Sequence, residues 1–228
     1  MGLPPVVLVH GFATSARRTW RSLGWIDLLR EAGREVHAPD VLGHGAAPKP
    51  HEPAAYADLE SWLAERLPDG PIDAIGFSLG ARLLLGVASD HPHRFRRLVV
   101  AGVGRNILYG DPEYRRRVAL AVAATRPSED PPMAYFAALA DRPDMDRAAL
   151  VALLEGFEAN IAISRLAHVT CPVLVVLGDR DRSGPPDDLV AALPDAELRT
   201  LRGVDHFATP KNYDFLSAAL DWVGKPPP

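Results

Sequence analysis

The sequence has little of what would stabilise a small secreted protein or direct a chain to a membrane. It has one cysteine, Cys171, among 228 residues, so no disulfide can form within the chain, which fits a reducing compartment. No apolar run approaches the ~20 residues of a membrane span. The stretch MGLPPVVLVHGF lacks the charged and long apolar regions of a secretory signal peptide. We therefore expect a soluble, cytoplasmic protein with no membrane partner.

The sequence also lacks an excess of basic charge. The formal net charge is −4, and lysine occurs only at Lys49, Lys211 and Lys225. Proteins that bind the nucleic acid backbone normally carry an excess of Lys and Arg, so nucleic acid is not an expected partner. The length suffices for one substantial α/β domain that needs neither disulfides nor metal to be stable.

Short apolar runs alternate with longer helical patterns along the chain, which is typical of a parallel sheet with crossover helices. The runs VVLV, LVVA and VLVVL are apolar without alternation, as in strands covered on both faces. The expected strands are Val6–Val9, Glu35–Ala38, Ile72–Ile75, Leu98–Ala101, Val173–Leu177 and Glu197–Leu201. The expected helices are Trp20–Glu31, Ala54–Arg66, Leu79–Ser89, Pro186–Leu193 and Tyr213–Val223.

One long segment interrupts this alternation. Residues 105–166 have helical patterns but no strand pattern, and this is far more chain than a crossover helix requires. We expect residues 1–104 and 167–228 to form one α/β core, and residues 105–166 to be a helical insertion that covers one end of the sheet.

The pentad Gly-Phe-Ser-Leu-Gly, residues 76–80, lies between an expected strand and an expected helix. Gly-x-Ser-x-Gly in this context is the nucleophile elbow, a tight strand-to-helix turn that exposes a serine hydroxyl. The glycines are needed because the strand and helix pass too close for a Cβ atom. A plain turn would also fit the pentad alone, but the strand and helix around it favour Ser78 as a nucleophile.

A serine nucleophile needs a base, and the base needs a group that orients it. Of the histidines after Ser78, only His206, in LRGVDHFATP, directly follows the last expected strand. The others lie at the wrong ends of helices or strands. The acid is expected just past the strand PVLVVLG, where both Asp179 and Asp181 qualify and the spacing favours Asp181.

An oxyanion needs hydrogen-bond donors, and two backbone N–H groups are suitably placed in the sequence. Phe12 follows the first expected strand in LVHGF, and Leu79 follows Ser78. Loss of one such donor typically costs about 3 kcal/mol of transition-state stabilisation. His-Gly could also be an ordinary turn at the end of a strand.

These motifs together resemble those of the α/β-hydrolase superfamily. The matching segments are VVLVHGF, APDVLGHGAAPKP, IGFSLGAR, PVLVVLGDRD and GVDHFA, in the order the family has them. The resemblance implies a mainly parallel six-stranded sheet, with the second expected strand at one edge, then the first, then the third to sixth. It implies a triad of Ser78, Asp181 and His206, and oxyanion donors at Phe12 and Leu79. It also implies a short helical cap at residues 105–166. The sequence departs from the family in that the usual N-terminal hairpin is not expected before the strand that leads to His-Gly.

Arg82 departs from most of the family. Ser-Leu-Gly-Ala-Arg, residues 78–82, is similar to the Ser-Leu-Gly-Gly-Arg of the menaquinone-pathway succinyl-cyclohexadiene-carboxylate synthases, lyases whose arginine helps bind substrate carboxylates. An arginine paired with a nearby acid fits equally well. In the insertion, we expect Tyr135 and Phe136 to contact substrate, although helical spacing also fits an ordinary apolar core.

We therefore expect a serine hydrolase that cleaves small carboxylic esters through an acyl-enzyme on Ser78, with a small-molecule substrate and no metal or organic cofactor. A lyase or C–C bond-cleaving enzyme, with a carboxylate-bearing substrate bound by Arg82, is one alternative. A non-catalytic ligand receptor is another. The sequence indicates neither the substrate nor the oligomeric state.

Overall fold

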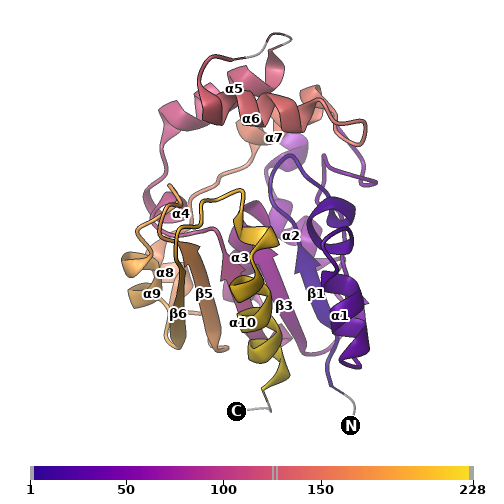
Figure 1. Ribbon diagram of the computed structural model, residues 1–228, viewed down its shortest axis with the longest axis vertical. Coiled ribbons are helices and arrows are strands. Elements are labelled where there is room, and N and C mark those ends of the chain that lie inside the picture. Colours follow the sequence, from indigo (N-terminus) through magenta and orange to yellow (C-terminus); the bar gives the residue numbers. More distant parts are fainter. Residues whose placement is uncertain (1–2, 125, 127, 226–228) are drawn as a thin grey trace.

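A parallel sheet forms the centre of the protein, whose computed structural model describes residues 3–124, 126 and 128–225. Six strands pair in the order β2-β1-β3-β4-β5-β6, and each neighbouring pair in the described residues is parallel (Figure 1). The predicted fold class and strand order are therefore confirmed. The strands are β1 Val6–Val9, β2 Val36–His37, β3 Ile72–Phe77, β4 Phe95–Ala101, β5 Val173–Gly178 and β6 Ala196–Leu201.

Helices cover both faces of this sheet and one of its ends. The α-helices are α1 Trp25–Glu31, α2 Leu59–Ala64, α3 Leu79–Asp90, α4 Asn106–Tyr109, α5 Pro112–Ala123, α6 Pro131–Ala140, α7 Arg147–Gly156, α8 Ile163–Leu166, α9 Asp187–Ala192 and α10 Tyr213–Gly224. Shorter helical turns are η1 Arg17–Arg21, η2 Pro53–Tyr56, η3 Pro92–Arg94 and η4 Thr209–Lys211. Within the described residues, no helix has both the length and the apolar character that a membrane span requires.

The strands are apolar on both sides because each side faces a different helical layer. In β1, Val6 and Leu8 belong to the apolar cluster that contains residues of α1 and α10. Val7 and Val9 belong to the opposite cluster, with residues of α2, α3 and α9. Successive side chains of a strand point to opposite faces, so an unbroken apolar run is what a sheet between two layers requires.

Two of the expected helices are each divided in the structure. The first separates into η1 and α1 because Gly24 adopts a left-handed φ of 81° between them, a conformation that a helix interior does not contain. The second separates into η2 and α2. There the Asp58 side chain accepts a hydrogen bond from the Ser61 N–H and begins a new helix.

The segment between β4 and β5 is helical and contains α4 to α8. Figure 1 shows α5, α6 and α7 above the end of the sheet that is opposite to the labelled chain termini. These three helices contribute to an apolar cluster of their own, which includes Val118, Met133 and Leu150. Ala13, in the loop after β1, belongs to the same cluster, so the helices pack on loops at the carboxyl ends of the strands.

Candidate active site

Ser78 occupies a strained turn between β3 and α3. Its φ of 53° and ψ of −115° are unusual for a residue with a side chain. The flanking glycines make the turn possible: a Cβ on Gly76 would lie 2.7 Å from the backbone of Ala81, and one on Gly80 would lie 2.1 Å from the Val9 carbonyl oxygen. The sequence therefore places a half-buried serine at the tip of a turn that few other residues permit.

Ser78, His206 and Asp181 form a continuous chain of hydrogen bonds. Nε2 of His206 lies 3.0 Å from the Ser78 Oγ. On the other side of the ring, Nδ1 lies 2.9 Å and 3.1 Å from the two carboxylate oxygens of Asp181. The structure thus brings together the three side chains predicted as a triad, from the ends of β3, β5 and β6.

The acid of this group is buried and remains ionised. Burial by itself raises the pKa of Asp181, but hydrogen bonds from His206 and Ser183 outweigh burial and hold the pKa below its ordinary value. A buried carboxylate can then bind the Nδ1–H of His206 and leave Nε2 free to accept a proton from Ser78.

The other two carboxylates near this edge are occupied elsewhere. Asp179 accepts a hydrogen bond from the Gly203 N–H at 2.7 Å, and Asp205 accepts one from the Ala208 N–H at 2.9 Å. The geometry therefore favours Asp181 over Asp179, as the spacing does.

Two backbone N–H groups belong to segments that adjoin Ser78. Leu79 is the first residue of α3, so its N–H has no partner within the helix. The Phe12 N–H belongs to the loop after β1, which runs beside the elbow because Gly11 has no side chain: a Cβ there would lie 3.0 Å from the Phe77 ring and 3.3 Å from the Ser78 Cβ. Among the residues described, neither N–H takes part in a hydrogen bond given by the structure, so both can receive an oxyanion.

Sequence comparison places this geometry in a known family. The model of the alpha/beta hydrolase fold matches residues 4–131, more than half of the chain. The chain belongs to the α/β-hydrolase fold family. A pimeloyl-[acyl-carrier protein] methyl ester esterase of Neisseria meningitidis serogroup B is 32% identical over 79% of this chain and 76% of that protein.

Two further similarities are more limited. A pimeloyl-[acyl-carrier protein] methyl ester esterase of Aromatoleum aromaticum is 36% identical over 45% of this chain, and the match spans only 38% of that protein. The solved enol-lactonase from Burkholderia xenovorans has a TM-score of 0.77 and 19% identity, and covers 99% of this chain and 93% of that one. At that identity the structural likeness shows the α/β-hydrolase fold alone. Both of these curated relatives are named as methyl ester esterases.

Two buried histidines fix the loop that carries Phe12 in this α/β hydrolase. Nε2 of His44 accepts the Ala13 N–H at 3.0 Å, and Nε2 of His10 accepts the Val41 N–H at 3.0 Å. Because Nε2 is the acceptor in each ring, the single proton sits on Nδ1, beside the carbonyls of Leu42 and Gly11. Burial, followed by the proximity of His10, lowers the pKa of His44 to about 3. Both rings are therefore neutral structural groups.

Aromatic side chains of α6 lie over the site. The Phe136 ring is 6.2 Å from Phe12 and 5.7 Å from Phe207, and Tyr135 stacks on Phe207 at 3.9 Å. Phe207 in turn contacts the His206 ring at 5.5 Å. The structure thus places Tyr135 and Phe136 at the site. Together they connect the loop that carries Phe12 with the loop that carries His206 and Phe207.

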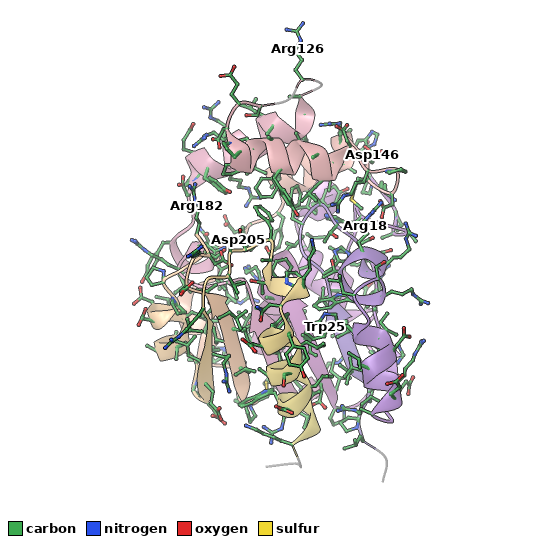
Figure 2. All side chains as sticks on the ribbon, in the orientation of Figure 1. Arg18, Trp25, Arg126, Asp146, Arg182 and Asp205 are labelled. Atoms are coloured by element: carbon green, nitrogen blue, oxygen red, sulfur yellow. The ribbon has the colours of Figure 1, made fainter. Side chains whose placement is uncertain are left out.

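The labelled residues of Figure 2 show where the site lies. Arg182, next to Asp181, and Asp205, next to His206, both lie below α5, α6 and α7, and Arg18 lies on the opposite side of the view (Figure 2). On that side Arg18 and Ser15 bind Asp144, which precedes α7, with Arg18 donating at 2.8 Å and Ser15 at 2.9 Å. The loop after Phe12 is therefore fastened to the helices above it.

Arg82 does not face this site. Its Nε donates to the Ala159 carbonyl at 2.8 Å, and one Nη donates to Glu60 at 2.5 Å. The other Nη donates to the carbonyls of residues 158 and 160 at 3.3 and 2.8 Å. The guanidinium is buried, and four of its five N–H groups donate to protein acceptors, which favours the alternative in which Arg82 pairs with a nearby acid. It fastens the end of the helical segment to α3.

Two residues near the triad were not anticipated from the sequence. Ser183 is buried, with its Oγ 3.4 Å from Nδ1 of His206. Phe207 contacts the His206 ring and also lines a surface hollow of about 440 Å³ with Tyr135, Asp205, Ala208, Lys211 and Asn212. Their closeness in sequence to Asp181 and His206 was the available signal.

Proposed function

We propose that this α/β hydrolase is a serine hydrolase that cleaves small carboxylic esters through an acyl-enzyme formed on Ser78. The observation that carries the proposal is the hydrogen-bonded series from Ser78 through His206 to Asp181, with distances of 3.0 and 2.9 Å. The similarity to methyl ester esterases over most of the chain supports an ester as substrate.

In the first half of the reaction, the Ser78 Oγ attacks the ester carbonyl carbon. Nε2 of His206 takes the serine proton, and the Asp181 carboxylate stabilises the imidazolium that forms. The former carbonyl oxygen becomes an oxyanion that the N–H groups of Phe12 and Leu79 bind. When the tetrahedral intermediate collapses, the C–O bond to the leaving alcohol breaks and His206 returns the proton to that alcohol.

In the second half, water cleaves the acyl-enzyme. His206 accepts one proton of the water as its oxygen attacks the acyl carbon, and the same two N–H groups bind the new oxyanion. Collapse breaks the bond to Ser78, which regains its proton from His206. The products are a carboxylic acid and free enzyme, and no other reactant is needed.

Residues 105–166 would act as the cap of this enzyme, between core segments 1–104 and 167–228. Tyr135 and Phe136 give this cap aromatic contacts with Phe207 and Phe12, the neighbours of His206 and Gly11, and such an apolar surface suits the uncharged part of an ester. The lyase alternative depended on Arg82, whose guanidinium is occupied by Glu60 and backbone carbonyls, so it is not proposed. The buried Cys171 suits the reducing conditions of the cytoplasm, where we expect the enzyme to act.

Covalent labelling tests the proposal directly. A fluorophosphonate should label the wild-type chain at Ser78 and release its leaving group stoichiometrically, and Ser78→Ala should remain unlabelled. Ser89→Ala is a matched control, because Ser89 is a buried serine at the far end of the same helix, and it should label like the wild type. Labelling of Ser78→Ala at wild-type rate, or no turnover of any short p-nitrophenyl ester by the wild type, would refute the proposal.

A further inference from the structure

Ser183 occupies an unusual place beside the proposed acid and base. It lies in the loop after β5, two residues beyond Asp181, and is only 8% exposed. Its N–H donates to the Asp181 Oδ1 at 2.8 Å, and its Oγ lies 3.4 Å from Nδ1 of His206. Ser183 therefore contacts both the Asp181 carboxylate and the His206 imidazole that this carboxylate would orient.

The protons available at this point determine what the hydroxyl can do. When Nε2 of His206 accepts from Ser78, the only ring proton is on Nδ1 and points toward the Asp181 carboxylate at 2.9 Å. The Ser183 oxygen can then only accept a share of that N–H. Its own proton is free to donate to the carboxylate of Asp181. Such donation from Ser183 is one of the smaller causes that hold the pKa of Asp181 below its ordinary value.

The backbone of Ser183 is held independently of its hydroxyl. Its carbonyl oxygen accepts the Asn106 N–H at 3.1 Å, and the carbonyl of Pro185 accepts the Arg105 N–H at 2.9 Å. The loop is thereby fixed to the beginning of the helical segment by backbone groups alone. No partner outside the Asp181–His206 pair is given for the Ser183 Oγ in the described residues, so support of that pair is the role left to the hydroxyl.

We propose that Ser183 is a positioning residue, whose hydroxyl donates to the Asp181 carboxylate and accepts a share of the His206 Nδ1–H. It thereby holds the imidazole in the tautomer and orientation that direct Nε2 at Ser78. This inference rests on the proposed function, because the orientation of His206 matters for turnover only if Ser78 is the nucleophile. The effect is expected in kcat, since the buried hydroxyl lies at Nδ1 of the imidazole, whereas Ser78 lies at Nε2.

The first test compares Ser183→Ala with Ser183→Thr on one p-nitrophenyl ester. Ser183→Ala should lower kcat about 10-fold, the loss associated with one hydrogen bond to a charged group, and leave KM within about twofold. Ser183→Thr, which keeps the hydroxyl, should recover most of that kcat. An alanine variant with wild-type kcat, or a folded threonine variant no better than alanine, would overturn the inference.

A second test separates positioning from general structural damage. Ser183→Ala is introduced into Asp181→Asn, and the rate of fluorophosphonate labelling of Ser78 is measured in both. If the hydroxyl acts through Asp181 and His206, the second change should cost less than twofold, because effects of residues that act as a unit are not additive. A full additional 10-fold loss would show that Ser183 acts by another route.

Proton NMR of the imidazole gives a readout that needs no turnover. The Nδ1–H resonance of His206 in the wild type, assigned by its absence from His206→Gln, should move or broaden in Ser183→Ala and return in Ser183→Thr. An unchanged resonance in Ser183→Ala contradicts the inference. If the wild type neither labels nor turns over esters, the proposed function has failed, while this resonance still decides the placement of the hydroxyl.

Discussion

Strand β3 has a buried polar cluster at each end, and the two clusters differ in how their charges are used. At the amino end, Asp73 is fully buried and its Oδ2 binds both Arg34 and Arg96. At the carboxyl end, Ser78 follows the strand and binds His206. Both clusters join segments that are far apart in the sequence, but only the second contains a partly exposed group in a strained conformation.

The difference separates a cluster that stabilises from one that can react. Arg34 also donates to the carbonyls of Pro4 and Val223, and Arg96 donates to that of Val223, so the amino-end cluster fastens the beginning and end of the described chain to the sheet. Its charges are paired and inaccessible. At the carboxyl end, the Asp181–His206 pair leaves Nε2 directed at a hydroxyl that a substrate can reach. Exposure and strain, more than burial of polar groups, distinguish the reactive cluster.

The largest effect is expected at the carboxyl end. His206→Gln removes the base and should lower kcat about 10⁴-fold or more, the loss typical of removing one member of such a triad. The free energy of unfolding should change by less than about 1 kcal/mol, because the ring is at the edge of the core. Ester turnover and urea denaturation measure the two quantities. His37→Gln, on the exposed edge strand β2, is the control and should behave as wild type in both.

The opposite pattern is expected at the amino end of the same strand. Asp73→Ala leaves the buried Arg34 and the partly buried Arg96 without their shared carboxylate and should lower the free energy of unfolding by about 3–5 kcal/mol. Turnover per folded molecule should stay within about twofold. Urea denaturation, with activity normalised to the folded fraction, checks both values, and Asp69→Ala provides an exposed acid just before β3 for comparison. A loss of kcat as large as that of His206→Gln would remove the distinction between the two ends.

The fold was predictable because its signals are local. Unbroken apolar runs such as VVLV and VLVVL indicate strands that are covered on both faces. The strand order follows once the family's motifs are recognised. The first and last residues of the strands and helices were harder to predict from the sequence. β4 begins at Phe95, three residues before its expected start, because Phe95 pairs with Ile72 of β3, a contact between segments 23 residues apart that no local pattern reveals.

The site was predictable only where its residues are constrained by the backbone. Ser78 is marked by the glycines that its turn requires, and His206 by its position after the last strand. The partners of Arg82 were not predictable, because its sequence position puts it on the helix of Ser78 but does not reveal Glu60 or the carbonyls of residues 158–160. Those partners come from two other helical regions, and only the packing of α2 and the helical segment on α3 brings them to the guanidinium.

Arg82, on the helix that follows Ser78, tests whether a charged side chain near the carboxyl-end cluster stabilises the fold or binds substrate. Arg82→Met should lower the free energy of unfolding by about 2–3 kcal/mol, less than a fully unpaired buried charge costs, because Glu60 keeps Arg165 as a partner. The ratio of kcat/KM for a carboxylate-bearing ester to that for a neutral p-nitrophenyl ester should not change. Arg66→Met, at an exposed arginine in the turn after α2, is the control. A selective loss with the acidic ester would return Arg82 to the substrate site.

His44 gives the smallest effect and shows that not every histidine at the reactive end belongs to the reaction. Its pKa is lowered to about 3 by burial, so the unfolded chain takes up a proton at this residue near pH 6.5 that the folded chain refuses. The stability due to this group is therefore present above pH 6.5 and falls by about 1.4 kcal/mol per pH unit as the pH decreases from there toward 3.

His44→Gln retains an acceptor for the Ala13 N–H but does not titrate. As the pH falls from 6 to 4.5, the difference in unfolding free energy between wild type and variant should thus shift by about 1.4 kcal/mol per pH unit in favour of the variant. Parallel stability curves for wild type and His44→Gln would mean that the ring becomes charged within the fold, and that the loop carrying Phe12 is held in some other way.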